Sequence, residues 1–304
     1  MTALRLGTRR SPLAIAQAEE VRELLATAGV DAEIVPMSTS GDEGVTAAAS
    51  GTQGLKGLWI DTILDALDKG DIDVAVHSAK DLPADEDEGG FLIAAVPSRA
   101  DASDVLITRA KALPRRATIG TSSIRRRAQL LAADPLLRMV ELRGNVDTRM
   151  RKLQEGQVDA LVLAAAGLAR LGIVPAHANP LAIDVMVPAP GQGCLALQTR
   201  ADDVETINAL RPLDHPPSHE ALNAERSLTW RLGGGCALPL GAHATTAGDG
   251  RVAMVAVVAS IDGALVVRVA VDGENAEAAA ARAAKDLISE GAETILSEVV
   301  GDDE

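Results

Sequence analysis

The sequence predicts an α/β protein made of two hinged α/β domains and a smaller C-terminal α+β domain. Strand-like and helix-like patterns alternate from residue 4 to about residue 200, which is typical of sheets covered by helices on both faces. Two segments of turn-forming residues, 97–99 and 188–193, interrupt this alternation and indicate that the chain crosses between two units. From residue 216 the order changes to helix, strands and helix, so we expect a third unit.

Local signals define the elements in order. Ser11 is a good N-cap and Pro12 suits the first helical position, while Gly29 and Gly70 end the first two helices. The first unit is predicted to hold strands 4–7, 33–35, 73–78, 91–96 and 194–198 and helices 12–28 and 58–69. The second holds strands 105–108, 118–120, 139–142 and 160–163, with helices 124–131, from 146 onward, and 167–171. The third holds helix 216–232, strands 253–260 and 264–270, and helix 276–290.

The crossings divide the chain into three predicted domains. They comprise 1–96 together with 191–212, then 97–190, then 216–304, and we expect largely parallel sheets in the first two. Residues 40–57 carry five glycines and no hydrophobic period. A loop of this length inside a compact domain is usually functional, so we predict an active-site lid there.

Positive charge is concentrated in one stretch of an acidic chain. The formal net charge is -14, yet ten of the 29 basic residues, with only three acidic ones, fall between positions 115 and 152. A local basic patch on an acidic protein attracts a specific anion while the surrounding field repels polyanions.

The arginines follow predicted strand ends, beside helix starts. Ser122 and Ser123 can cap a helix whose first turn holds Arg125 and Arg126, at the positive end of the helix dipole. Free N–H groups, hydroxyls and guanidinium groups together form a cradle for carboxylate or phosphate. The arrangement recurs around Arg143 and Arg149 and around Thr8-Arg9-Arg10-Ser11, so we predict a pocket for a small molecule with several anionic groups.

Composition excludes several classes of partner. Aromatic residues are 1% of the chain and no nucleic-acid-binding motif is present, so we expect no nucleic acid partner. No apolar run reaches the ~20 residues of a membrane span, and a strand pattern begins at once, so we expect a cytoplasmic protein without a membrane partner. His and Cys residues show no metal-ligand spacing, and none is expected to bind a metal.

A buried strand at 73–78 leads directly to Lys80 and Asp81. Open α/β sheets place their sites at the carboxyl ends of strands. Asp81 and Lys80 are therefore either a plain surface ion pair or a site in which the carboxylate stabilises a cation that develops on a substrate.

The chain has two cysteines in different settings. Cys194 lies in a predicted strand and fits an inert buried thiol. Cys236 follows Gly233-Gly234-Gly235 after a helix with arginines, and is either inert as well or a reactive thiol on an accessible loop.

Six motifs together resemble the porphobilinogen deaminase (hydroxymethylbilane synthase) family. They are GTRRSPLAIAQA (7–18), DVAVHSAKDLP (73–83), GTSSIRRRAQL (120–130), LRGNVDTR (142–149), APGQG (189–193) and LNAERSLTWRLGGGC (222–236), in the family's order. The resemblance implies two hinged domains like those of periplasmic binding proteins plus a third domain. It also implies a monomeric transferase that joins four porphobilinogen molecules into hydroxymethylbilane, in the biosynthesis of haem and related tetrapyrroles, on a dipyrromethane cofactor held by a thioether.

The resemblance assigns roles to individual residues. Cys236 matches the cysteine that carries the dipyrromethane, and Asp81, with Lys80, matches the catalytic pair. The residues matching cofactor contacts are Lys80, Asp81, Ser123, Arg125, Arg126 and Arg143. Those matching substrate contacts are Arg9, Ser11, Gln17, Arg143, Arg149 and Arg170.

One segment departs from the family, and one alternative stays open. Many members follow an aromatic residue with Lys-Glu-Leu, whereas here Trp59 precedes Ile60-Asp61-Thr62. The alternative is a hinged protein that binds a carboxylate ligand without catalysis; it would carry no covalent pyrrole.

Overall fold

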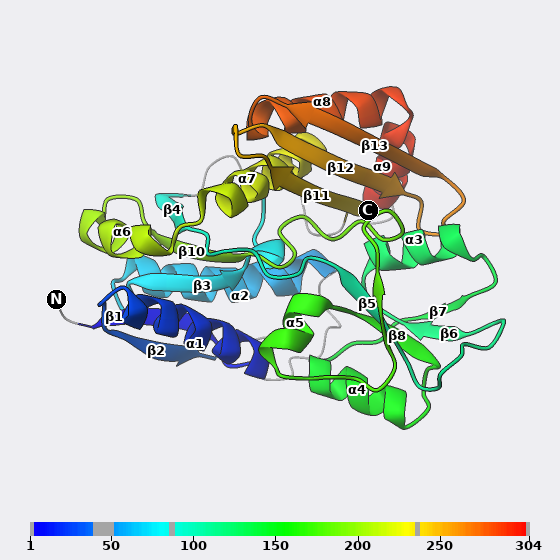
Figure 1. Cartoon of the computed structure of the whole chain (residues 1–304), viewed down its shortest axis with the longest axis horizontal. Helices are drawn as coiled ribbons and strands as arrows, with labels where there is room; N and C mark the ends of the chain where they lie inside the picture. The colour runs from blue at the N-terminus through cyan, green and yellow to red at the C-terminus, as the bar shows by residue number, and fades with distance from the viewer. Residues whose placement is uncertain (1–2, 39–51, 85–88, 235–237, 302–304) are drawn as a thin grey trace.

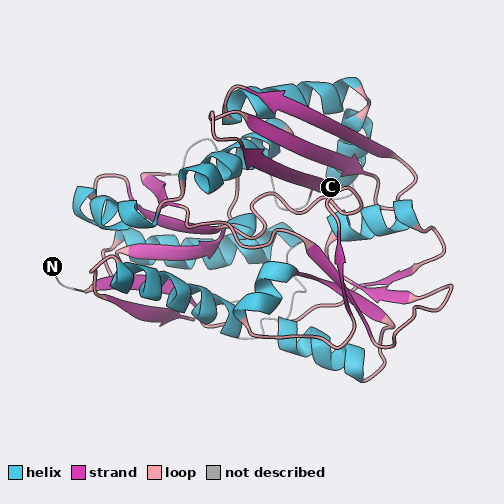
Figure 2. Cartoon of the chain, viewed as in Figure 1, coloured by secondary structure: helices cyan, strands magenta, loops and turns pink. Residues whose placement is uncertain are grey.

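The computed structural model describes residues 3–38, 52–84, 89–234 and 238–301, without the side chains of 52–59 and 299–301. Its strands form two five-stranded sheets and one three-stranded sheet. The two larger sheets lie in neighbouring lobes, and the smaller sheet with its helices lies above them (Figure 1). Helices flank each sheet (Figure 2). Each sheet takes all its strands from one predicted domain range, while the domain boundaries themselves stay a prediction.

The first lobe is built on the sheet β2-β1-β3-β10-β4. Its strands are β1 (Leu4–Arg9), β2 (Ala32–Met37), β3 (Val74–Ser78), β4 (Phe91–Ala95) and β10 (Leu195–Arg200), and its helices are α1 (Pro12–Thr27), α2 (Thr52–Asp68) and α6 (Val204–Leu210), with short 3₁₀ turns η1 (Ala79–Asp81) and η2 (Arg211–Leu213). Successive side chains of β3 point to opposite faces. Val74 and Val76 therefore pack with Leu25 of α1, while Ala75 packs with Leu67 of α2.

The second lobe repeats this plan with the sheet β7-β6-β8-β5-β9. Its strands are β5 (Asp104–Thr108), β6 (Thr118–Gly120), β7 (Arg138–Val140), β8 (Ala160–Ala164) and β9 (Ala178–Leu181), and its helices are α3 (Ile124–Ala133), α4 (Val146–Gln154) and α5 (Ala165–Arg170). Leu161 and Leu163 pack with Leu153 of α4, whereas Val162 packs on the opposite face with Leu130 of α3. Both lobes thus have helices on both faces of a sheet, as predicted.

The third unit is an antiparallel sheet covered by helices. Strands β11 (Leu240–Thr246), β12 (Val252–Ala259) and β13 (Val266–Gly273) pair in sequence order. Helices α7 (Pro216–Arg231), α8 (Ala276–Ser289) and α9 (Ala292–Gly301) share one apolar core with the strands. The predicted α+β class of this unit is confirmed.

The prediction of largely parallel sheets is confirmed for four of the five strands in each larger sheet, which share one direction, while the fifth strand runs the opposite way. In the first lobe β10 runs antiparallel to both β3 and β4, and in the second β5 runs antiparallel to both β8 and β9. These two strands come directly after the crossings between lobes. Because Leu195 pairs with Ser78 at the end of β3, and Asp104 with Ala164 at the end of β8, each enters where the parallel strands finish and runs back along them.

The range predicted for the lid, residues 40–57, is helical in its last part. Residues 52–57 belong to helix α2, which begins at Thr52 rather than near Leu58. Residues 40–51 lie outside the described residues. Among the α-helices and strands of the described residues, β9, β11, α6 and α9 were not predicted.

Candidate active site

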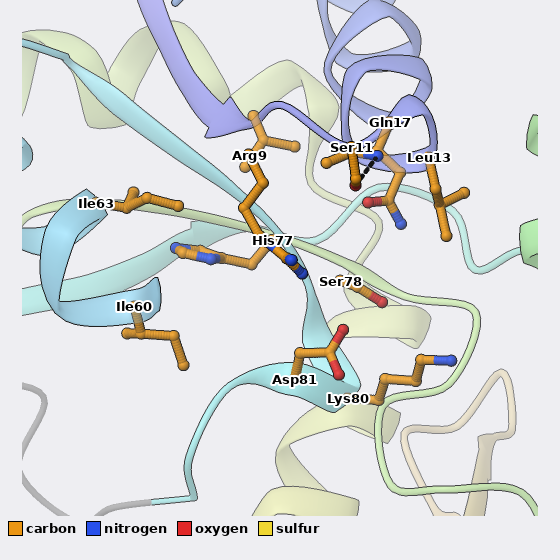
Figure 3. Close-up of a pocket in the computed structure, with 12 residues that line it drawn as sticks. Arg9, Ser11, Leu13, Gln17, Ile60, Ile63, His77, Ser78, Lys80 and Asp81 are labelled. Atoms are coloured by element: carbon orange, nitrogen blue, oxygen red, sulfur yellow. Dashed lines mark hydrogen bonds between the residues drawn. The ribbon is translucent and has the colours of Figure 1, made fainter. Parts of the chain in front are cut away.

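A cavity in the first lobe brings together the ends of β1 and β3 and the start of α1. It encloses about 650 Å³ of empty space, including its opening to solvent. Figure 3 shows the polar side chains of two chain segments around this space. Arg9, Ser11 and Gln17 come from the end of β1 and from α1, and His77, Ser78, Lys80 and Asp81 come from β3 and the following turn.

Helix capping places the first of these groups. Ser11 is the N-cap of α1, and its hydroxyl accepts a hydrogen bond from the Ala14 N–H at 3.3 Å. Pro12 occupies the first helical position, as predicted. Gln17 follows on the inner side of the helix and is 5% exposed.

A close backbone contact places Lys80 and Asp81. After β3 the chain makes the turn η1, against which Gly191 of the APGQG motif packs with φ +73°. A Cβ at this position would lie 2.9 Å from both the Ala79 carbonyl carbon and the Lys80 nitrogen. Only glycine fits here without displacing the turn, which explains this part of the motif.

Burial tunes the two titratable groups beside Asp81. It lowers the pKa of Lys80 to about 8, an effect that Asp81 partly opposes and that Arg126 and Arg125 reinforce. Burial also lowers the pKa of His77 to about 4, so this imidazole is neutral near pH 7. Arg125 and Arg126, which lower the pKa of Lys80, belong to α3 of the second lobe. The second lobe therefore contributes positive charge to the same site.

Arg125 and Arg126 lie in the first turn of α3 and are buried. The Ser123 hydroxyl caps this helix by accepting from the Arg126 N–H at 3.4 Å. Both guanidinium groups bind the carboxylate of Asp104, with Arg125 Nη1 2.8 Å from Oδ2 and Arg126 Nη2 2.7 Å from Oδ1. Gln192 Nε2 also donates to Oδ1 at 2.9 Å.

Asp104 is the residue that sequence reasoning missed. Its carboxylate is fully buried, and the two guanidinium groups hold its pKa far below the usual range against the opposing effect of burial. An acidic residue at the head of the apolar strand Asp104–Thr108 was the available signal, because a buried carboxylate requires a cationic partner.

The remaining arginines occupy more peripheral places. Arg149 is half-buried and donates to the Gly144 carbonyl at 2.7 Å and to the Ser122 hydroxyl at 3.4 Å. The contact with Ser122 places Arg149 beside the start of α3, and burial and the charge of Arg126 lower its pKa. Arg143 is exposed and pairs with Glu141 at 2.5 Å.

Arg170 is not among the residues that line the cavity. Its side chain, 8% exposed, donates from Nε to Glu20 Oε2 at 2.7 Å and from Nη2 to the Gly193 carbonyl at 3.3 Å. The structure thus brings Arg9, Ser11, Gln17, Lys80 and Asp81 together around one space. Cys236 lies outside the described residues.

The two buried arginines of α3 carry more positive charge than the one carboxylate that they share. Arg125 and Arg126 share the single carboxylate of Asp104, and the buried Nε of Arg125 has no hydrogen-bond partner within the described structure. Buried guanidinium groups are costly unless they are paired and hydrogen-bonded. Together with Lys80, these groups suit an anionic ligand that carries carboxylates.

Two family models match this chain over most of its length. "Porphobilinogen deaminase, dipyromethane cofactor binding domain" matches residues 4–208, and "Porphobilinogen deaminase, C-terminal domain" matches residues 220–289. The chain belongs to the porphobilinogen deaminase family. Residues 209–219 separate the two matched regions and include the first turn of α7. This helix precedes the Gly-rich segment that contains Cys236.

Curated relatives cover nearly the whole chain. The porphobilinogen deaminase of Syntrophotalea carbinolica is 43% identical over 97% of this chain and 96% of its own length. That of Brevibacillus brevis is 39% identical over 99% and 98%. Among solved structures, a nutrient-binding protein from Burkholderia cenocepacia bound to methionine is 14% identical, with a TM-score of 0.43 over 75% of this chain and 95% of that one.

Two further findings concern the described residues alone. No helix among them is long and apolar enough to cross a membrane. Nor do any three of their His, Cys, Asp or Glu side chains cluster in a way that could hold a metal ion.

Proposed function

We propose that this protein is a porphobilinogen deaminase, a transferase that deaminates four porphobilinogen molecules, joins them head to tail and releases hydroxymethylbilane. The observation that carries the proposal is the carboxylate of Asp81 in a cavity that also holds Arg9 and Lys80, in a chain of this family. An anionic substrate needs the cations, and a cationic intermediate needs the carboxylate. The same space offers both.

The cofactor of this family suits the residues that are present. Arg125, with its unpartnered buried Nε, Arg126, Lys80 and Ser123 are the groups that would hold the carboxylates of a dipyrromethane, with Arg143 at the rim. A bound dipyrromethane supplies a covalent pyrrole to which substrate is added. We propose Cys236 as its attachment point, through a thioether.

Helix α7 precedes Cys236 in the sequence and contacts the first lobe. This helix ends at Arg231, and Arg226 within it donates to the Pro83 carbonyl at 2.8 Å, two residues beyond Asp81. The helix that leads to the cysteine loop is thereby tied to the segment that carries the catalytic carboxylate.

Asp81 is proposed to act electrostatically. When ammonia leaves porphobilinogen, the breaking C–N bond takes its electron pair with the nitrogen and leaves positive charge spread over the pyrrole. A fixed carboxylate attracts this cation more strongly than the neutral ring, which lowers the barrier. Lys80, half-buried beside it, is proposed to bind a carboxylate of cofactor or substrate.

The substrate's carboxylates require a separate set of cations. We propose that these are bound by Arg9, Ser11, Gln17, Arg143, Arg149 and Arg170. Arg9, Ser11 and Gln17 line the cavity. Arg149 and Arg170 lie outside it and would contact a substrate carboxylate only after a movement of the lobes or growth of the pyrrole chain. We further propose that the protein acts in the cytoplasm as a monomer, without a metal ion.

The test is turnover with porphobilinogen. We expect the purified protein to release four ammonia molecules for each linear tetrapyrrole formed, with the tetrapyrrole identified by mass. Asp81→Asn, loaded with cofactor, is the matched control and should bind substrate while releasing ammonia very slowly. Binding of porphobilinogen by the wild-type protein without its consumption would instead identify a carboxylate receptor.

A further inference from the structure

Glu20 holds the guanidinium group of Arg170 across the junction between the lobes. Glu20 belongs to α1 of the first lobe, and Arg170 is the last residue of α5 in the second. The Nε to Oε2 distance is 2.7 Å, and Arg170 Nη2 also donates to the Gly193 carbonyl in the segment that crosses between lobes. One side chain thus joins both lobes and their connection.

The pair stands beside the candidate active site. Glu20 follows Gln17 by three residues, so the two lie on the same side of α1, and Gln17 lines the cavity. The same helix approaches α5 at a second point, since a Cβ on Gly167 would lie 3.7 Å from the Leu13 side chain. Arg170 therefore lies at a short reach from the wall of the cavity, yet outside it.

Arg170 and Glu20 differ in how much each depends on the ion pair, because they differ in burial. The side chain of Arg170 is 8% exposed, so its charge requires an anion beside it. The side chain of Glu20 is 37% exposed and can return to water at small cost. A ligand carboxylate could therefore take the place of Glu20 on Arg170 without leaving a buried charge unpaired.

We propose that Glu20 is a positioning residue that occupies Arg170 until a carboxylate of the growing pyrrole chain displaces it. The proposal rests on the proposed function for the identity of that carboxylate. Because displacement breaks the ion pair between α1 and α5, it also releases one tie between the lobes. Glu20 then lowers the apparent affinity of Arg170 for substrate. The apparent Kd equals the intrinsic Kd divided by the fraction of protein in which Arg170 is not paired with Glu20.

The first experiment measures porphobilinogen affinity by calorimetry, in cofactor-bearing protein with Asp81→Asn to prevent turnover. Glu20→Gln removes the competing charge but keeps the shape, and we expect Kd to fall roughly twofold to fivefold, the range of a partly exposed ion pair. Glu19→Gln is the control, because Glu19 pairs with Arg22 within α1 and does not reach the second lobe. It should leave Kd unchanged.

The second experiment asks whether the effect passes through Arg170. In an Arg170→Gln background the tightening by Glu20→Gln should disappear, which a purely structural role of Glu20 does not predict. An unchanged or weaker Kd in Glu20→Gln overturns the proposal, as does a gain that persists without Arg170.

The outcomes separate this proposal from the proposed function. If wild-type protein binds porphobilinogen but never consumes it, the function fails while the Glu20 comparison still decides the role of the pair. If no variant binds porphobilinogen at all, both fail, because no ligand carboxylate is present to displace Glu20.

Discussion

Replacing Asp104 by asparagine tests the charge arrangement on which the site depends. Asp104 is fully buried and is the one carboxylate shared by Arg125 and Arg126. Asparagine keeps the size and part of the hydrogen bonding but leaves two buried guanidinium groups without their counter-charge. Removing one partner of a buried ion pair typically costs about 3–5 kcal/mol. At roughly 2–4 °C per kcal/mol, the Tm of the cofactor-free protein should fall by about 6–20 °C.

The pH dependence of this difference has a definite sign. The folded pKa of Asp104 is depressed, so its contribution to stability is fully present above the pKa of about 4 that it has in the unfolded chain. The gap in Tm between wild type and Asp104→Asn should thus stay constant from pH 5 to pH 8. Below pH 4 it should shrink, by about 1.4 kcal/mol in free energy of unfolding per pH unit.

Thermal unfolding followed by circular dichroism between pH 3 and pH 8 measures both effects. The control is Asp65→Asn, because Asp65 forms an exposed pair with Lys69 on the surface of α2 and should leave Tm nearly unchanged. A loss below 2 °C in Asp104→Asn, or a gap that widens on acidification, would refute the reasoning. A cofactor-loaded sample should show a smaller effect of the substitution, since the carboxylates of the ligand supply counter-charge to the freed arginines.

Three further predictions concern the site and its ligand. Asp81→Asn should keep cofactor and fold but lower single-turnover ammonia release by about 10²–10³-fold, and wild-type release would assign the role to another acid. Because burial lowers the pKa of Lys80 to about 8, the KM for porphobilinogen should rise as pH increases through 8 in wild type but not in Lys80→Arg, and identical profiles would remove Lys80 from carboxylate binding. Protein without cofactor should melt at a lower temperature than loaded protein, whereas equal values would contradict a cleft stabilised by its anionic ligand.

Local signals were sufficient for most of the architecture. Ser11 with Pro12 and Ser123 before α3 mark helix starts that the structure confirms. The alternation of apolar strands and amphipathic helices located the two lobes, because each strand must bury both faces under helices. The direction of β10 was not predictable in this way. Its short apolar sequence would suit a parallel or an antiparallel strand equally, and its direction depends on the end of the sheet at which the chain enters the lobe.

The elements or helix turns that were missed lack the residue pattern from which a strand or helix is normally predicted. β9 (Ala178–Leu181) is an edge strand that is mostly exposed and contains Pro180, so it lacks the apolar alternation of a buried strand. β11 (Leu240–Thr246) is buried but made largely of small and polar residues. Helix α2 extends back to Thr52 through Gly54 and Gly57, against the low helix propensity of glycine.

The candidate site was predictable as a set of residue types but not as a set of contacts. The arginine-rich stretch indicated an anion pocket. In the structure, however, Arg125 and Arg126 form ion pairs with Asp104, and Arg170 forms one with Glu20. Pairings between residues this distant in sequence depend on how the lobes pack. No local pattern specifies them.

The intact mass of the purified protein tests the central claim most directly. The account predicts a mass greater than that of the polypeptide by one dipyrromethane, with the added mass on the peptide that contains Cys236. Cys194→Ala should retain it, because Cys194 is a buried thiol whose pKa burial raises to about 12, whereas Cys236→Ser should lack both the added mass and activity. Fully active protein with the mass of the bare polypeptide would contradict the account.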